Sequence, residues 1–271
     1  MIGRDLLSIV RLSDGGSLIY TEGIVEDGMI LSGKARSSAT GNSYEVKNGY
    51  LDLLKSSIGA DNLANLTNFL PGAGRGYEPL WRVRSLSLLT GESFPIEREL
   101  EIITDLVSPI PGGRYLDLGC SSGLYTRSLA LDGGVAVGVD ISPSMLREAT
   151  RRSRIVGARP SFIRANAMNL PFIDASFTGA VCGGSLNEFG DPARVLRETH
   201  RVLEPGGRLA IMGILRAGTP RGRRLQRLLS TGGLKFFDPD ELHSLLDHVG
   251  FEPDALQTIG QVFFAGATSR T

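Results

Sequence analysis

The spacing of apolar and polar residues changes twice along the chain and divides it into three stretches. In residues 1–60, short apolar runs alternate with Gly and Asn-Gly turns, which predicts small antiparallel strands. In residues 61–110, apolar residues recur at helical spacing around a glycine-rich break, which predicts a helical linker or cap. Residues 111–271 alternate apolar runs with helical patterns, which is typical of an α/β domain. We therefore predict an α/β domain preceded by a small β module and a helical cap.

The composition is that of an ordinary globular protein. The chain has 271 residues, 41% of them hydrophobic and 21% charged, and is long enough for a catalytic domain with a small appendage. Lys and Arg number 29, as do Asp and Glu, so no overall field draws the protein to nucleic acid or an anionic membrane. No apolar run is long enough to span a bilayer, and the first ten residues are not typical of a secretory signal. We expect a cytoplasmic protein without a membrane span.

Cysteine and histidine are too few to build a metal centre. Cys120 and Cys182 each lie at the end of a predicted strand, and the three histidines are scattered. Packing of small side chains in a reducing compartment explains both thiols better than a disulfide does. The sequence therefore predicts no metal site and no disulfide.

A glycine-rich turn within residues 116–130, LDLGCSSGLYTRSLA, carries the clearest chemical signal. It places the carboxylate of Asp117 and a tight turn from Gly119 to Gly123 where a buried strand passes into a helix. Such a junction offers backbone N–H groups and an acid to a small charged ligand. The spacing is G-x-x-x-G, which does not favour a dinucleotide pyrophosphate. The alternative interpretation is a turn that only packs tightly.

A second acid follows the next predicted strand, VAVGVD at residues 135–140. Asp140 comes 21 positions after Gly119, close to the interval at which α/β nucleoside sites place an acid against ribose hydroxyls. The alternative is that Asp140 caps the following helix. Ser142 already supplies that cap, however, and Pro143 suits the first helical position.

Four segments in order identify a resemblance that covers about residues 100–267. They are LDLGCSSG, VGVDISPSML, RANAMNLPFIDASFTGAVCGGSLNEF at 164–189, and LRETHRVLEPGGRLAI at 196–211. Together they resemble the class I S-adenosylmethionine-dependent methyltransferases, in the subgroup of ubiquinone and menaquinone biosynthesis methyltransferases. The resemblance implies a Rossmann-like seven-stranded mixed sheet. It also implies that the chain ends in a helix at 238–248 and two antiparallel strands.

The resemblance also assigns roles to single residues. Asp117 and Gly119 would lie by the methionine moiety of S-adenosylmethionine, Gly123 would permit close helix packing, and Asp140 would bind the ribose. The loop at 166–168 would hold adenine, with the backbone N–H of Ala167 facing a ring nitrogen. The cofactor-binding residues implied in this way are Tyr77, Asp117, Gly119, Cys120, Ser121, Gly123, Asp140, Ile141, Met145, Asn166, Ala167, Met168 and Ser185.

The chain departs from the family pattern at two positions. Ser121 stands where the family usually has Gly, which raises the question of whether the turn adopts its usual backbone angles without strain. Asn166 stands where the family usually has Asp. Its side-chain oxygen still accepts hydrogen bonds, but the negative charge is lost. We expect an intact cofactor site with somewhat weaker binding.

The acceptor side of the site is predicted from fewer signals. Tyr77, Trp81 and Arg82 are candidates for the roof of the pocket and for contacts to the substrate, together with Asn187. The alternative is that Trp81, Leu80 and Leu88 form interdomain core and that Arg82 is only a surface charge. Glu188, just after the fourth strand, is the candidate catalytic base. Its alternative is an acid at a helix start that is stabilised by the helix dipole.

Two further segments bear on the choice of substrate. Residues 216–227, RAGTPRGRRLQR, hold five arginines that could form a basic lid for an acidic substrate or RNA, or simply a solvated helix face. The first 60 residues resemble the zinc-ribbon-like module that precedes some methyltransferases, including one that modifies guanine in ribosomal RNA. The usual Cys pairs are absent, and residues such as Ser32 and Ser37 lie in those regions, so the module is expected to fold without metal.

Two classes of function follow, with a third as a weaker alternative. The favoured one is methyl transfer from S-adenosylmethionine to a small apolar or aromatic acceptor of quinone, pigment, isoprenoid or polyketide type. The second is methylation of a ribosomal RNA base, which the balanced charge and the missing Cys ligands disfavour. The third is cofactor binding without catalysis. The favoured partner is thus a small-molecule acceptor, and the sequence specifies neither the methylated atom nor an oligomeric state.

Overall fold

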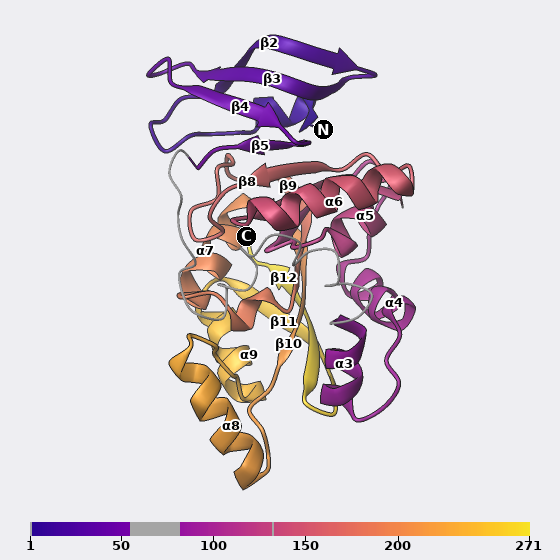
Figure 1. Cartoon of the computed structure of the whole chain (residues 1–271). Coiled ribbons are helices and arrows are strands. Elements are labelled where there is room, and N and C mark those ends of the chain that lie inside the picture. Colours follow the sequence, from indigo (N-terminus) through magenta and orange to yellow (C-terminus); the bar gives the residue numbers. More distant parts are fainter. Residues whose placement is uncertain (1, 55–81, 132) are drawn as a thin grey trace.

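The protein is described here by a computed structural model that covers residues 2–54, 82–131 and 133–271 (Figure 1). Its described strands form one twelve-stranded sheet in the order β1-β3-β4-β5-β8-β7-β6-β9-β10-β12-β11, with β2 paired to the other edge of β3. The strands are β1 (Ile2–Gly3), β2 (Leu18–Glu26), β3 (Met29–Ser37), β4 (Ser43–Lys47), β5 (Tyr50–Asp52), β6 (Arg114–Leu118), β7 (Val135–Asp140), β8 (Ser161–Arg164), β9 (Phe177–Gly183), β10 (Leu203–Ile214), β11 (Phe251–Ile259) and β12 (Val262–Ser269).

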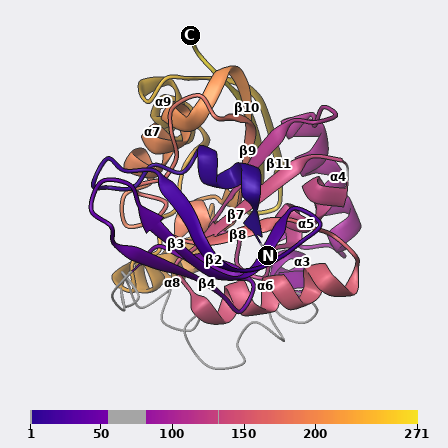
Figure 2. The ribbon, with the colours of Figure 1, turned by 90° about the horizontal axis from the view of Figure 1, so that it is seen from above.

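The helices lie between these strands and mostly on the two faces of the sheet. They are α3 (Val83–Thr90), α4 (Ile96–Val107), α5 (Leu124–Leu131), α6 (Pro143–Ile155), α7 (Pro192–Val202), α8 (Pro220–Thr231) and α9 (Pro239–His248), with the 3-10 helices η1 (Arg4–Ser8) and η4 (Ser185–Asn187). Seen from above, α7 and α9 lie on one side of the sheet and α4, α5 and α6 on the other (Figure 2). Helix α9 and the strands β11 and β12 that follow it confirm the predicted helix and two antiparallel strands at this end of the fold.

The central part of the sheet confirms the predicted fold class. Its seven strands run β8-β7-β6-β9-β10-β12-β11, and only β12 is antiparallel to its neighbours β10 and β11. Successive residues of β10 face opposite cores, as the twofold period of a strand requires. Ile211 belongs to the core that contains Leu196 of α7 and Leu246 of α9, whereas Met212 packs with Ile103 of α4. The carboxyl ends of the parallel strands therefore meet at one edge between two layers of helices.

The N-terminal strands continue the central sheet rather than standing apart from it. Strand β5 pairs in parallel with β8, with Leu51 opposite Ile163. Leu6 and Val10 are buried in the same core as Phe172 of the methyltransferase-like part. The small ribbon-like module at residues 1–60 stays a prediction. A strand pair and a shared core join this segment to the rest of the molecule, because so short a segment buries little apolar surface alone.

A carboxylate organises the turns of this N-terminal segment. Asp14 accepts hydrogen bonds from the Gly16 N–H (2.9 Å) and from the hydroxyls of Ser37 (2.8 Å) and Thr40 (2.6 Å). The Thr40 hydroxyl is the main cause that lowers the pKa of Asp14. Ser37 thus bonds to an acid in a region where a zinc ribbon would carry thiolates. Within the described ranges, no cluster of three or more His, Cys, Asp or Glu side chains has the geometry of a metal site.

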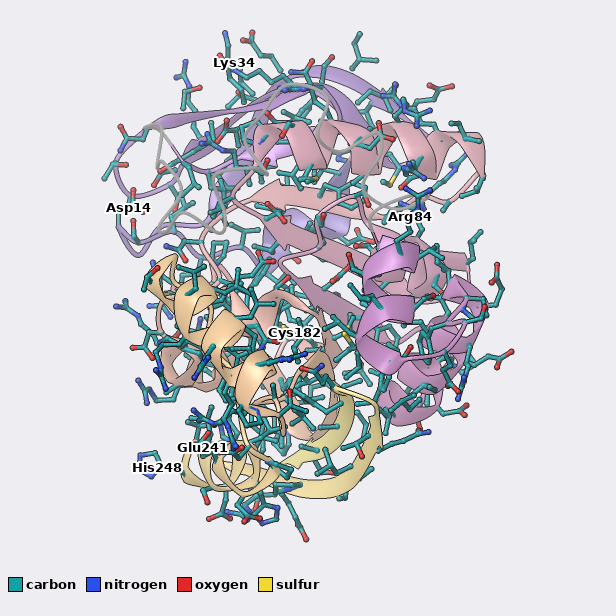
Figure 3. All side chains as sticks on the ribbon, turned by 60° about the horizontal axis from the view of Figure 1, so that its bottom comes forward. Asp14, Lys34, Arg84, Cys182, Glu241 and His248 are labelled. Carbon is teal, nitrogen blue, oxygen red and sulfur yellow. The ribbon has the colours of Figure 1, made fainter. Side chains whose placement is uncertain are left out.

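Two features concern the molecule as a whole. Both cysteines are buried and unpaired, and Cys182 lies in the interior of the molecule (Figure 3). None of the described helices combines the length and the apolar character that a membrane crossing requires.

Candidate cofactor and acceptor site

The turn after β6 has the backbone geometry that its glycines predict. Gly119 and Gly123 have φ angles of +62° and +78°, in the left-handed region that favours glycine. A Cβ atom on Gly123 would come within 2.9 Å of Ala149 on α6, so this glycine permits close helix packing. Ser121 also has a positive φ, +49°, which costs a residue with a side chain about 1 kcal/mol. The departure from Gly at this position therefore carries strain.

Asp117 lies beneath this turn and does not line the cavity above it. Its buried carboxylate accepts hydrogen bonds from the N–H (2.9 Å) and the hydroxyl (2.5 Å) of Thr126, in the first turn of α5. Burial raises its pKa to about 6, against the lowering effect of those bonds. We expected a contact to the methionine moiety. The structure differs because the alternation of β6 turns this side chain toward the N-terminus of α5.

Asp140 faces the cavity at the end of β7. Its carboxylate accepts the N–H groups of Ser121 (2.8 Å) and Ser142 (2.7 Å), which link the two turns after β6 and β7. Burial raises its pKa, against the effect of these bonds. The Ser142 hydroxyl, and not Asp140, caps α6 by accepting the Met145 N–H, as predicted. Asp140 is thus an acid held in place by backbone donors at the cavity wall.

The loop after β8 presents backbone groups to the same cavity. The side-chain oxygen of Asn166 accepts the Met168 N–H at 2.9 Å and so shapes the loop from within. The N–H of Ala167 has no hydrogen-bond partner among the described residues, although the residue is 5% exposed. A buried donor without a partner favours a ligand acceptor at this point.

One cavity at the carboxyl edge of the sheet collects most of the predicted site. We call polar wall the set Gly119, Ser121, Asp140, Asn166 and Ala167, and apolar wall the set Leu86, Leu89, Phe189, Met212 and Ile214. The predicted residues that line this cavity are Arg82, Gly119, Ser121, Asp140, Ile141, Asn166, Ala167, Met168, Ser185 and Glu188. Sequence reasoning missed the apolar wall, because its residues look like ordinary core positions.

Besides Asp117, four described residues of the predicted site lie outside the lining, and one of them is Gly123, which packs against α6. Cys120 and Met145 are buried beneath the polar wall, where the sulfur of Met145 accepts the Ser121 hydroxyl at 3.4 Å. Asn187 is also buried, and its side chain hydrogen-bonds to backbone groups. Its amide donates to the carbonyls of Ile214 (2.9 Å) and Lys235 (2.6 Å) and accepts the Ile214 N–H (2.8 Å). The Asn187 amide thus ties η4 to the end of β10, and its predicted contact to the substrate stays a prediction.

Arg82 is part of a buried ionic cluster at the cavity. Its Nε donates to both carboxylate oxygens of Glu99 (3.2 and 3.1 Å), and its Nη2 to the Tyr125 hydroxyl (2.9 Å). Tyr125 in turn donates to Glu99, which is 0% exposed. The alternative of a surface charge is therefore wrong for Arg82. Glu99 sits four residues before buried Ile103 on α4, so an acid in the apolar stripe was the missed signal.

Glu188 lies at the cavity directly after η4. Burial raises its pKa to about 7, with a further contribution from the charge of Asp140, and Arg82 opposes the rise. It is not the acid of a helix start, because the side chain of Asp191 caps α7 by accepting the Arg194 N–H. A carboxyl with a pKa near neutrality suits proton transfer. Tyr77 and Trp81, the remaining roof candidates, lie outside the described residues.

The sheet order and the carboxyl-edge cavity define a class I methyltransferase fold, and comparisons with known proteins agree. The family profile described as "Methyltransferase domain" matches residues 116–211. The chain is 35% identical over 161 residues to O-methyltransferase rstn1 of Aspergillus nomiae, a match that covers 58% of this chain and 72% of that protein. The chain belongs to the class I S-adenosylmethionine-dependent methyltransferases.

Two other relatives match over smaller shares of their own lengths. A 27-O-demethylrifamycin SV methyltransferase of Amycolatopsis mediterranei is 33% identical over 63% of this chain and 66% of its own length. A demethylmenaquinone methyltransferase of Corynebacterium kroppenstedtii is 36% identical over 39% and 43%. The chain thus spans less than two thirds of these two relatives. The solved structure of a SAM-dependent methyltransferase from Methanosarcina mazei is 25% identical and covers 65% of this chain and 98% of its own, with a TM-score of 0.53.

Proposed function

We propose that this protein binds S-adenosylmethionine against the polar wall and transfers its methyl group to a small apolar or aromatic acceptor against the apolar wall. The single observation behind this proposal is that one cavity is lined by both walls and by Glu188. The quinone, rifamycin and O-methyltransferase relatives support an acceptor of this kind, and none of them favours the RNA alternative.

The polar wall fits the cofactor in its donors and acceptors. Asp140 accepts backbone N–H groups and keeps further lone pairs for ribose hydroxyls. The unpartnered Ala167 N–H would donate to a ring nitrogen of adenine. At Gly119 and Ser121, which line the cavity, the cofactor would approach the backbone closely. The side-chain oxygen of Asn166 shapes the loop by accepting the Met168 N–H and keeps a second lone pair for a donor of adenine. When bound, the cofactor supplies an electrophilic methyl group on a sulfonium.

The protein's own chemical task is to orient the acceptor and remove its proton. The apolar wall excludes water and holds the acceptor by burial of apolar area. Glu188, with a pKa near 7, accepts the proton that the acceptor atom loses as it bonds to the methyl group. Arg82, fixed by Glu99 and Tyr125, presents a cation at the same cavity and stabilises negative charge that develops on the acceptor.

Calorimetric titration with S-adenosylmethionine, S-adenosylhomocysteine and NAD tests the first half of this proposal. We expect heat from the two methionine cofactors and none from NAD, and the reverse result would contradict it. The second half is tested by release of S-adenosylhomocysteine with a panel of phenols and hydroquinones. Binding without turnover on any of them would favour a cofactor-binding protein. We also infer a cytoplasmic setting, which the two unpaired cysteines support.

A further inference from the structure

The arginine-rich segment after β10 divides into two parts with different surroundings. Arg216 pairs with Asp238 (2.8 Å) and Glu241 (2.7 Å) at the start of α9, so it belongs to the structural framework. The other four arginines lie on α8, a helix that contains no acidic residue. Within the described part of the chain, none of those four forms an ion pair. They are Arg221, Arg223, Arg224 and Arg227.

The same helix exposes three leucines. Leu225, Leu228 and Leu229 are 58%, 67% and 41% exposed, and their spacing of three and four residues puts them on neighbouring positions of one helical face. Helix α8 buries only Gln226 among its side chains and projects from the body of the molecule (Figure 1). Single exposed leucines are common, but three together on a short helix mark an interaction surface.

A hydrogen-bonded anchor holds this helix beside the cavity. The Gln226 side chain accepts the Ala217 N–H (2.7 Å) and donates to the Leu215 carbonyl (2.9 Å). Leu215 directly follows Ile214, which belongs to the apolar wall. The three exposed leucines therefore lie on a helix that Gln226 anchors to the segment directly after the apolar wall.

We propose that α8 is an interfacial helix that docks the protein on an anionic lipid surface, with Leu225, Leu228 and Leu229 in the headgroup boundary. The four arginines supply charge complementarity to anionic headgroups, and the leucines supply apolar area, which is the combination that such helices use. RNA would also meet the arginines, but it gives the leucines nothing to bury. The protein has no net charge, so this attraction is local to α8.

Flotation with vesicles tests this proposal without cofactor or acceptor, so its result is independent of methyl transfer. We expect binding to phosphatidylcholine vesicles that contain phosphatidylserine, and little binding to pure phosphatidylcholine. The double variant Arg224→Gln/Arg227→Gln should lower the partition coefficient about 25-fold, since each arginine near such a surface contributes about fivefold. Leu225→Ala/Leu228→Ala should lower it about tenfold or more. Circular dichroism and cofactor titration verify that each variant is folded.

A matched control removes the same charge at the other end of the molecule. Arg36 on β3 and Arg154 at the end of α6 are exposed, and the N-terminal strands that carry Lys34 lie far from Glu241 beside α8 (Figures 1 and 3). Arg36→Gln/Arg154→Gln should bind vesicles like the unchanged protein. Three results would overturn the proposal. They are absence of binding to the anionic vesicles, full binding by the leucine variant, and loss with the control equal to that with the arginine variant.

Two competing occupants have their own outcomes. If the leucine variant dissociates a dimer in analytical ultracentrifugation while vesicles fail to bind, α8 contacts a second copy, and the lipid proposal is abandoned. It is likewise abandoned if ribosomal RNA displaces the protein from vesicles and its binding depends on the arginines but not on the leucines. RNA affinity that leaves vesicle binding unchanged at physiological salt would support the lipid surface.

Discussion

The polar and apolar walls of the cavity are built in different ways. In the polar wall, the carboxylate of Asp140 accepts backbone N–H groups of the turns after β6 and β7, and the side-chain oxygen of Asn166 accepts the N–H of Met168. In the apolar wall, Leu86 comes from α3 and Met212 from β10, more than a hundred residues apart. The polar wall is built from the ends of three parallel strands within residues 119–167, whereas the apolar wall is assembled by packing of more distant segments. Related enzymes that methylate different acceptors should therefore differ mainly in the residues of the apolar wall.

The largest effect is expected from Glu188, the acid at the cavity. Glu188→Gln should lower kcat/KM by about 100-fold or more, because the acceptor loses its base. In the unchanged protein, kcat/KM should fall about tenfold per pH unit below about 7 and level off above it, since only the ionised carboxylate accepts a proton. The variant should lose this dependence. Glu241→Gln, which neutralises an exposed acid, is the control and should keep the pH dependence. Equal pH profiles for Glu188→Gln and the unchanged protein would contradict the assignment of Glu188 as the base.

The largest effect on the free energy of unfolding is expected from the buried ionic cluster of Arg82, Glu99 and Tyr125 at the cavity. Glu99→Ala leaves the Arg82 guanidinium, 8% exposed, without its carboxylate, which should lower the free energy of unfolding by about 3 to 5 kcal/mol. Tyr125→Phe removes one hydroxyl from the same cluster and should cost about 1 kcal/mol. Urea denaturation measures both. Equal losses would mean that the hydrogen bonds of the Tyr125 hydroxyl, and not the charge pair, carry the stabilisation.

The next prediction compares Asp140, which lines the cavity, with Asp117, which lies beneath it. Asp140→Ala should weaken cofactor binding by about 1 to 3 kcal/mol, because ribose hydroxyls and two backbone N–H groups lose their acceptor. Asp117→Asn should leave cofactor affinity nearly unchanged, since Asp117 caps α5 and does not line the cavity. Calorimetry with S-adenosylhomocysteine measures both. A larger loss for Asp117→Asn would show that this acid reaches the cofactor after all.

The smallest effect concerns the strained turn of the polar wall. Ser121→Gly relieves a φ of +49° and should raise the free energy of unfolding by less than about 1 kcal/mol, because the freer unfolded chain offsets part of the gain. Ser121→Ala keeps the strain and loses the contact of the hydroxyl with the Met145 sulfur, so it should not stabilise the protein. Thermal unfolding distinguishes the two. Stabilisation by Ser121→Ala would show that the hydroxyl, and not the backbone, is the source of strain.

The sequence by itself determined the parts that rest on short-range interactions. The positive φ angles of Gly119 and Gly123, the Ser142 cap of α6 and the apolar run of β7 follow from hydrogen bonds and sterics within a few residues. The family segments contain these same features in order, which is why the fold class and the polar wall could be predicted. Asp140 lines the cavity, and its bond to ribose stays a prediction.

Only the tertiary structure decided what depends on contacts between distant segments. It turned Asp117 under the turn and put Glu99 against Arg82. It also tied Asn187 to strand β10 and joined β5 to β8. An acid or an amide reads the same in a sequence whether it faces a cavity or a buried donor. The free energy of desolvation, which separates these cases, depends on neighbours that folding brings together from far along the chain.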